Sequence, residues 1–380
     1  MQPFVAIHIG AGYHSTQNEA KYKKLCTMAS DAAIEAMKAG ASATLGVCAA
    51  IRVLEDSSLT NAGYGSNLNA DGYVECDAGI MEGSNGLSGG VAAVRGVDNP
   101  IDLAYEVMKC QADGSCAGLI PPLLLCGDGA RAFAKKRMPQ HLAYDAELDS
   151  HHITESSRQK YKSNKQTLRD WREARVASLQ SDAGDDCLAK NSKRARTDFT
   201  QDTVGAICSD SNGSVTSGVS SGGISLKMPG RVGEAALYGC GCYADSDPQK
   251  SKDQERGSEP SGVGVSISGT GEYIQRSMLA LNCGQQLARE NDADPATTLH
   301  GTITREMLDC RFLRNVKAKP VGVLAVKRNV EGLEVIYAHN TASFGLGYRL
   351  GDAKAVAIMS RLDSLSANTL KTSSIFCKYA

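Results

Sequence analysis

The sequence predicts an α+β protein in which stacked β-sheets are covered by helices. Strand-like apolar runs fall into two clusters, one in each half of the chain, and segments with helical spacing of apolar residues lie between them. The chain has 380 residues, of which 42% are hydrophobic, enough to bury one large core or two modest ones. A doubly wound α/β fold would give a similar pattern, and the sequence alone leaves that alternative open.

Strands and helices alternate in the first third of the chain. The run Phe4–Ile9 is typical of a buried strand, and we expect it to stop at Gly10 and Gly12. Apolar residues at helical spacing predict a helix over 19–38, with Gly40 as its stop. The remaining expected elements are helices at 42–55, 100–109 and 128–136, a turn-rich loop at 60–67, and strands around 73–80 and 90–94.

A polar segment separates the two halves. From 139 to 201 the chain is rich in Ser, Lys, Arg, Asp and Gln and contains its one tryptophan, Trp171. Such a composition buries too little apolar surface to offset the entropy of ordering, except for a helix around 168–179. We therefore predict a long, partly disordered segment that remains flexible just before Thr203.

Strand character returns directly after this segment. The turn signal Asn212-Gly213 predicts a hairpin, and the elements expected after it are a strand at 262–268, a helix from the turn at 268–272 to about 289, a further helix, and final strands at 321–326 and 333–338.

The hairpin has a predicted register with chemical consequences. If Ser209 and Ser214 flank its loop, antiparallel pairing places Thr203 opposite Ser220 and beside Ser221. Two hydroxyl groups would then lie close to the start of the first strand.

Composition disfavours several classes of function. The net charge is −1, so no overall field favours nucleic acid or a membrane surface. The 13 cysteines show no CxxC pair, and the histidines lack ligand spacing, so we expect reduced thiols and no metal or cofactor. No apolar stretch reaches membrane-spanning length, and the N-terminus lacks the features of a secretory signal, so we expect an intracellular protein.

Thr203 would become a nucleophile if the bond before it were broken. A disposable segment ends at Asp202 and a core strand begins at Val204, so this junction is where a free amine would be useful. The α-amine of a threonine has a pKa of roughly 7.7 to 8.0 and can accept the proton of its own hydroxyl near neutral pH. A structural threonine at the start of a strand is the plainer interpretation.

Several motifs together resemble one family. In the second half they are 203–206, 219–223, 229–233 and 268–272, and in the first half 8–12, 60–63 and 77–83. In this order they are similar to the signatures of the type 2 asparaginase family of N-terminal-threonine hydrolases. The segments 12–15, 65–69 and 235–242 are most similar to its threonine aspartase (taspase) branch.

The resemblance implies a fold and an activity. The fold would be the four-layer αββα sandwich of N-terminal-nucleophile (Ntn) hydrolases. It would be a single domain built from an α subunit, 1–202, with a folded part at 1–138 and a flexible basic linker at 139–202, and a β subunit, 203–380. The chain would cleave itself between Asp202 and Thr203 and cut protein substrates after aspartate. The αβ units could pair as a dimer of heterodimers, and no cofactor is implied.

The resemblance also implies roles for site residues. Thr203 would be the nucleophile, oriented by the second hydroxyl, Ser221. Arg231 would receive a substrate carboxylate, a task suited to its guanidinium group. The remaining matches are Gly10 and Asn61, which would line the site, and Ser268, Gly269 and Gly271, whose turn would contribute contacts to the oxyanion hole.

One position departs from the wider family and bears on the substrate. Glu234 stands where the members that hydrolyse amino acids usually have Asp, which in them binds the substrate's amino group. The longer side chain would crowd that group, which weakens the alternative of an L-asparaginase or isoaspartyl dipeptidase acting on small substrates.

Two further interpretations concern partners and location. Basic residues at 158–165 and 190–196 favour a nuclear import signal over a merely solvated linker, so we expect the protein in nucleus and cytoplasm, acting on nuclear regulatory proteins. A second class of function is an unprocessed, inactive scaffold whose linker mediates binding in the nucleus. An intact chain of 40.1 kDa after purification would favour the scaffold.

Overall fold

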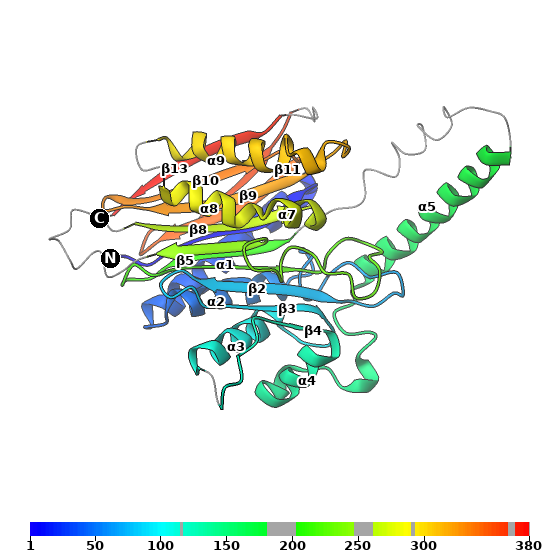
Figure 1. Ribbon diagram of the computed structural model, residues 1–380, viewed down its shortest axis with the longest axis horizontal. Coiled ribbons are helices and arrows are strands. Elements are labelled where there is room, and N and C mark those ends of the chain that lie inside the picture. Colours follow the sequence, from blue (N-terminus) through cyan, green and yellow to red (C-terminus); the bar gives the residue numbers. More distant parts are fainter. Residues whose placement is uncertain (115–116, 181–202, 247–260, 290–292, 364–368, 380) are drawn as a thin grey trace.

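The protein folds into four layers, with two stacked β-sheets in the middle and helices on both outer faces (Figure 1). The computed structural model describes residues 1–114, 117–180, 203–246, 261–289, 293–363 and 369–379. The predicted α+β class and sandwich of two covered sheets are confirmed.

The larger sheet has the strand order β12-β11-β1-β5-β6-β2-β3-β4. Its strands are β1 (Phe4–Gly12), β2 (Cys76–Glu82), β3 (Ser88–Val94), β4 (Leu124–Cys126), β5 (Val204–Ser209), β6 (Val215–Ser221), β11 (Ser343–Leu350) and β12 (Val356–Arg361). The smaller sheet, in the order β13-β10-β9-β8-β7, contains β7 (Cys242–Ser246), β8 (Gly262–Gly269), β9 (Val321–Arg328), β10 (Gly332–His339) and β13 (Lys371–Lys378). Among the described strands only β3 and β4 pair in parallel, which excludes the doubly wound alternative.

Helices cover the outer face of each sheet. The larger sheet carries α1 (Glu19–Lys38), α2 (Ala43–Glu55) and α3 (Pro100–Ala112), with α4 (Gly127–Arg137) beside β3 and β4. The smaller sheet carries α8 (Leu279–Arg289) and α9 (Pro295–Ile303), preceded by α7 (Gly271–Ser277). Short turns of 3₁₀ helix lie at Thr16–Asn18, Pro139–His141, Asp145–Glu147 and Arg311–Leu313, and a π-helical turn lies at Thr304–Leu308. Among the described residues no helix is both long and apolar enough to cross a lipid bilayer.

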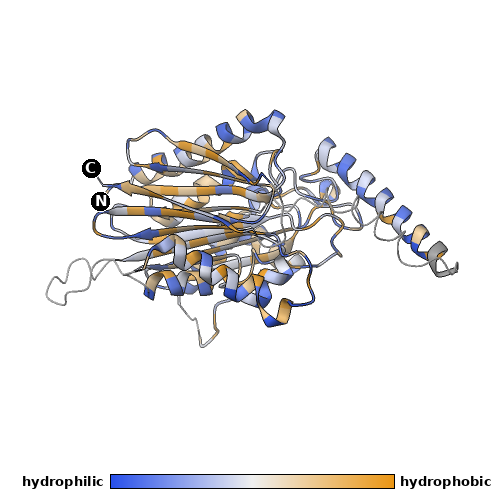
Figure 2. Cartoon of the chain, turned by 90° about the horizontal axis from the view of Figure 1, so that it is seen from above, coloured by the Kyte–Doolittle hydropathy of each residue, from blue (hydrophilic) through white to orange (hydrophobic). Residues whose placement is uncertain are grey.

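Strand β1 shows why two cores form. Its alternate side chains enter different clusters, because successive residues of a strand point to opposite faces. Val5, Ile7 and Ile9 pack under α1 and α2. Phe4 and Ala6 pack between the two sheets. The strand therefore lies in an inner layer, buried on both faces, and apolar residues follow the strands throughout the body (Figure 2).

The polar segment after residue 139 differs from its prediction. Where the structure describes it, up to residue 180, it contains α5 (Glu155–Gln180), a helix of 26 residues, instead of a flexible linker with a short helix at 168–179. Both views show α5 projecting from the body, and it is largely hydrophilic (Figures 1 and 2). The start of the helix is anchored, since Thr154 and Ser157 cap it and Asn164 donates to Ser225 Oγ at 2.8 Å. Residues 181–202, including the basic cluster at 190–196, lie outside the described residues.

The C-terminal part holds more strands than predicted. Beyond the two expected strands, β11 and β12 join the larger sheet and β13 pairs with β10. Strand β13 alternates half-buried and exposed residues at a sheet edge, so its apolar run is short and gave no sequence signal. The predicted helix to residue 289 is two helices, broken at Met278, whose φ is +42°. The eleven cysteines that the structure describes are free thiols.

Candidate active site

The start of β5 and the end of β6 bring two hydroxyl side chains together. Val204 pairs with Ser220, so Thr203, directly before β5, lies across from Ser221. The predicted register, with Thr203 opposite Ser220, is wrong by one residue. Asp210 explains the difference, because its carboxylate accepts N–H groups from within the turn and lengthens the loop so that Ser209 pairs with Val215.

Thr203 sits between a hydroxyl and a carboxylate. Its Oγ1 lies 3.0 Å from Ser221 Oγ and 3.0 Å from Glu234 Oε1. The Gly223 N–H also donates to Ser221 Oγ, at 3.0 Å. The Thr203 hydroxyl is placed to donate its one proton to Ser221 Oγ or to Glu234 Oε1. The nucleophilic oxygen of the proposed chemistry thus contacts both a second hydroxyl and a carboxylate.

Burial makes the Glu234 carboxyl a weaker acid than a solvent-exposed glutamate. The residue is 3% exposed, and burial raises the pKa of its carboxyl to about 7. A carboxylate at hydrogen-bond distance from a hydroxyl, with a pKa near the working pH, is suited to act as a general base. In the uncut chain Thr203 has no free amine, so among the described residues Glu234 is the group placed to take its proton.

The loop at 60–67 holds the Ser221 end of the site. Asn61 and Asn67 each donate a side-chain N–H to the carbonyl of Gly223 at 2.9 Å. Gly222 N–H donates to the Asn61 carbonyl at 2.7 Å. The backbone that presents Ser221 is thereby fixed from a segment more than 150 residues earlier in the chain.

Arg231 is paired with an acidic side chain from the start of α7. Its Nε and Nη2 donate to the two carboxylate oxygens of Glu272 at 2.8 and 2.7 Å. The pair is bidentate, and the arginine side chain is 13% exposed. Nη1 faces Gly223 and Gly233, where an added Cβ would lie 3.0 Å from it. The guanidinium therefore has one edge held by Glu272 and another directed toward Gly223 and Gly233.

The turn after β8 reaches the site through its glycines. Gly269 has a φ of +154°, and a Cβ there would lie 2.5 Å from the Pro320 carbonyl, so only glycine fits. A Cβ on Gly271 would lie 2.6 Å from Glu234 Oε2. Ser268 is instead tied to β1, because its Oγ accepts the Ala11 N–H at 2.9 Å.

The structure gathers most of the residues singled out from the sequence. A small cleft is lined by Asn61, Thr203, Ser221, Gly223, Ile224, Arg231, Glu234 and Gly269. Gly10 lies at the irregularity where the pairing of β1 shifts, with a φ of +106°, and is not among the lining residues. Asp202 lies outside the described residues.

Two contributors to the site were missed in the sequence. Glu272 is the last residue of the 268–272 motif, but its pairing with Arg231 depends on the position of α7. Asp77 accepts the N–H groups of Gly233 and Ala93, both at 2.8 Å, and so fixes the segment that carries Glu234. An acidic residue inside a buried strand was the signal that could have revealed Asp77.

Comparisons with known proteins agree on a family. A family model described as "Asparaginase" matches residues 1–345. The chain is 33% identical over 281 residues to an isoaspartyl peptidase/L-asparaginase of Xenopus laevis, covering 74% of each chain. It is 34% identical over 291 residues to a plant-type L-asparaginase of Pyrobaculum calidifontis, covering 76% of this chain and 81% of that one. It is 30% identical over 283 residues to the isoaspartyl peptidase of Escherichia coli, covering 73% and 74%.

Proposed function

Because this chain belongs to the asparaginase family of Ntn hydrolases, we propose that it is a self-processing threonine endopeptidase of the taspase type. It cleaves itself between Asp202 and Thr203, and it then cleaves protein substrates after aspartate. The observation that carries the proposal is the position of Thr203 Oγ1, 3.0 Å from both Ser221 Oγ and Glu234 Oε1.

Self-cleavage follows from these contacts of Thr203 Oγ1. Glu234 takes the Thr203 hydroxyl proton while Oγ1 attacks the Asp202 carbonyl carbon, and the C–N bond breaks as the nitrogen is protonated. The product is an ester between Asp202 and the Thr203 side chain. Water hydrolyses this ester, which leaves a carboxylate on Asp202 and a free α-amine on Thr203. That amine then serves as the base for later substrates.

A positive charge in the cleft supports the proposed preference of the enzyme for aspartate. Asp202 directly precedes Thr203, so the proposed self-cleavage requires the site to accept an aspartyl residue within a polypeptide. Among the described residues that line the cleft, Arg231 is the cation, and its Nη1 edge is directed toward Gly223, whose N–H donates to Ser221 Oγ. An arginine that is already oriented by Glu272 loses little entropy when it also binds a substrate carboxylate.

The comparisons favour a second candidate, hydrolysis of small aspartyl substrates. The relatives named above are isoaspartyl peptidases and L-asparaginases, and these names match small amides and β-aspartyl dipeptides better than proteins. Against this candidate stands Glu234. Its carboxyl contacts Thr203 directly and has a pKa of about 7, so it is partly neutral at pH 7 and provides a crowded, weak partner for an α-ammonium group.

The two candidates are separated by substrate competition. Processed protein is given a peptide containing Gln-x-Asp-Gly, L-asparagine and a β-aspartyl dipeptide, and the products are quantified by mass spectrometry. We expect cleavage of the peptide after Asp at the highest kcat/KM. Turnover of the small molecules alone would overturn the endopeptidase proposal and support the second candidate. In both cases Thr203→Ala is the inactive control.

We also propose, from the sequence, that the basic linker directs the protein to the nucleus, where its substrates are regulatory proteins, and that αβ units pair with one another. The basic residues of 158–165 lie on the projecting helix α5, where an import receptor could reach them (Figure 1). Imaging of a tagged chain with and without the lysines and arginines of 190–196, and light scattering of the processed protein, test these two points.

A further inference from the structure

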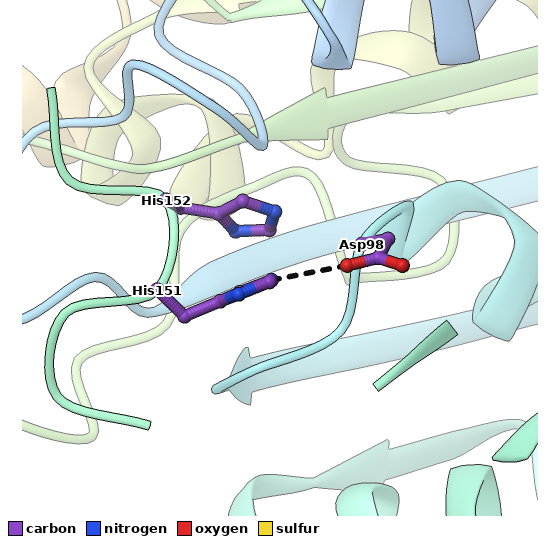
Figure 3. Close-up of side chains that lie close together, drawn as sticks. All are labelled: Asp98, His151 and His152. Carbon is purple, nitrogen blue, oxygen red and sulfur yellow. Dashed lines mark ion pairs between the residues drawn. The ribbon is translucent and has the colours of Figure 1, made fainter. Parts of the chain in front are cut away.

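A group of polar side chains lies outside the cleft, where the α4–α5 connection meets the segment between β3 and α3. Asp98, after β3, faces His151 and His152, which precede α5 (Figure 3). One ligand atom from each of the three lies within 4.8 Å of the others. His151 Nε2 is 3.3 Å from Asp98 Oδ1. His141 adds a fourth candidate, with its Nδ1 3.9 Å from Asp98 Oδ2.

The backbone is arranged to present both imidazoles together. Side chains of consecutive residues in an extended chain diverge, but His152 has a φ of +66°, a left-handed conformation that is uncommon outside glycine. The two rings consequently lie on the same side, with centroids 4.0 Å apart. Figure 3 shows the His151 ring directed at Asp98, with the His152 ring beside it.

One of these nitrogen atoms is buried without a hydrogen bond. His151 Nε2 has no hydrogen-bond partner although it lies close to the Asp98 carboxylate. A buried nitrogen normally acquires a partner, because leaving it unpaired costs about 1–3 kcal/mol. A ring nitrogen that faces a carboxylate oxygen without a hydrogen bond is an arrangement that a bridging cation would satisfy.

We propose that Asp98, His151 and His152 form a site for a divalent transition-metal ion of the Zn²⁺ class. Two imidazoles and a carboxylate are a ligand set that suits Zn²⁺, at distances of roughly 2.0–2.2 Å. Ligand atoms on one tetrahedral ion lie about 3.4 Å apart, so small rotations of the side chains close the site. The Asp98 side chain is 44% exposed, which gives an ion access from solvent.

The site would tie the segment before α5 to the body of the protein. Asp98 N–H donates to the His141 carbonyl at 3.0 Å, and Val97 bridges to Leu142, so the two sides already have a fixed relative position. Gly65 N–H donates to the His152 carbonyl at 3.2 Å. Gly65 belongs to the 60–67 loop, whose Asn61 holds the backbone beside Ser221. A bound ion would thus also brace the loop that supports the nucleophile.

Binding is tested by titrating chelator-treated full-length protein with Zn²⁺ and Co²⁺. The variants are Asp98→Asn and His152→Asn, the second chosen because asparagine tolerates positive φ. His300→Asn is the matched control, since His300 lies on α9 and its ring contacts Thr372. We expect wild type and the control to bind one ion at this site, and both site variants to bind it at least about tenfold more weakly.

Two readouts make the result decisive. Co²⁺ bound here should show d–d bands without a thiolate charge-transfer band, which excludes binding by cysteine. Zn²⁺ should slow hydrogen exchange at the Gly65 amide in wild type and leave it unchanged in His152→Asn. Equal ion binding by all four proteins, or a thiolate band for the bound Co²⁺, would overturn the proposal. Matching thermal unfolding of the metal-free proteins verifies that the variants fold.

Discussion

Thr203 Oγ1 and Glu234 Oε1 lie 3.0 Å apart, inside a site where both residues are only 3% exposed. This relationship joins the first residue after the proposed cleavage junction to a carboxyl group 31 residues further along the chain. In the proposed mechanism Glu234 serves as the base before any free amine exists. A mechanism that relied on the Thr203 amine alone would have no base for the first cleavage. In the proposed mechanism the site therefore has a base both before and after cleavage.

Replacing Thr203 by alanine should abolish processing. The variant lacks the only atom that attacks the Asp202 carbonyl in the proposed mechanism, so it should stay a single chain on a denaturing gel. Thr203→Ser keeps the hydroxyl and should still be cut, more slowly, because serine lacks the β-branch that restricts χ1. N-terminal sequencing of the smaller fragment of wild type should begin at Thr203. Normal processing of the alanine variant would rule out the proposed mechanism.

Glu234→Gln should slow processing while leaving the fold intact. Glutamine has the same shape but cannot accept the proton, and general-base contributions are typically ~10²–10⁴-fold. The wild-type rate should rise with pH through about 7, as the carboxyl ionises, and then level off. The variant should lack that inflection. Glu331→Gln, at an exposed position outside the site, is the control. The measurement is the half-time of chain cleavage across pH 5–9; an unchanged inflection in Glu234→Gln contradicts the assignment.

Ser221→Ala should lower the cleavage rate by about 10- to 100-fold, the equivalent of one buried hydrogen bond to a polar partner. The change removes a hydrogen-bond partner of Thr203 Oγ1 and leaves the Gly223 N–H without its acceptor. Ser221→Thr retains the hydroxyl and should keep most of the rate. Single-turnover kinetics on both variants measure the effect, and equal rates for alanine and threonine would show that the hydroxyl has no such role.

Glu55→Gln should make stability less dependent on pH. Glu55 is fully buried beneath Ser220, which donates to its Oε1 at 2.6 Å, and burial raises the pKa of the carboxyl from 4.5 to about 8. A raised pKa means that the folded state binds the proton more tightly than the unfolded state. The associated stability is present below pH 4.5 and is lost as pH rises toward 8.

The size of this effect is on the order of 3–5 kcal/mol between pH 4.5 and 8. Urea unfolding at pH 5 and 8.5 measures it. Wild type should be clearly less stable at the higher pH, whereas Glu55→Gln, which stays neutral and keeps the acceptor oxygen, should change much less. Parallel pH dependence in the two proteins would mean that Glu55 does not titrate as proposed.

Local pattern was enough to locate most of the elements near the site. The helix at 19–38 and the hairpin around Asn212-Gly213 rest on periodicity and turn chemistry, which involve neighbours in sequence. The composition of 139–180 was misleading, because α5 is anchored near its start by a few specific contacts, such as Asn164 to Ser225 and Tyr161 against the core. The Zn²⁺-class site we propose was likewise not expected, since Asp98 is more than 50 residues from His151.

By itself the sequence determined that Thr203 follows a polar segment and begins a core strand, and which motifs accompany it. Only the tertiary structure decided that Thr203 faces Ser221 instead of Ser220, that Glu234 reaches its hydroxyl, and that Glu272 holds Arg231. The physical reason is one of range. Propensity and periodicity act over a few residues, whereas these contacts depend on sheet register and on how α7 packs beside the stacked sheets.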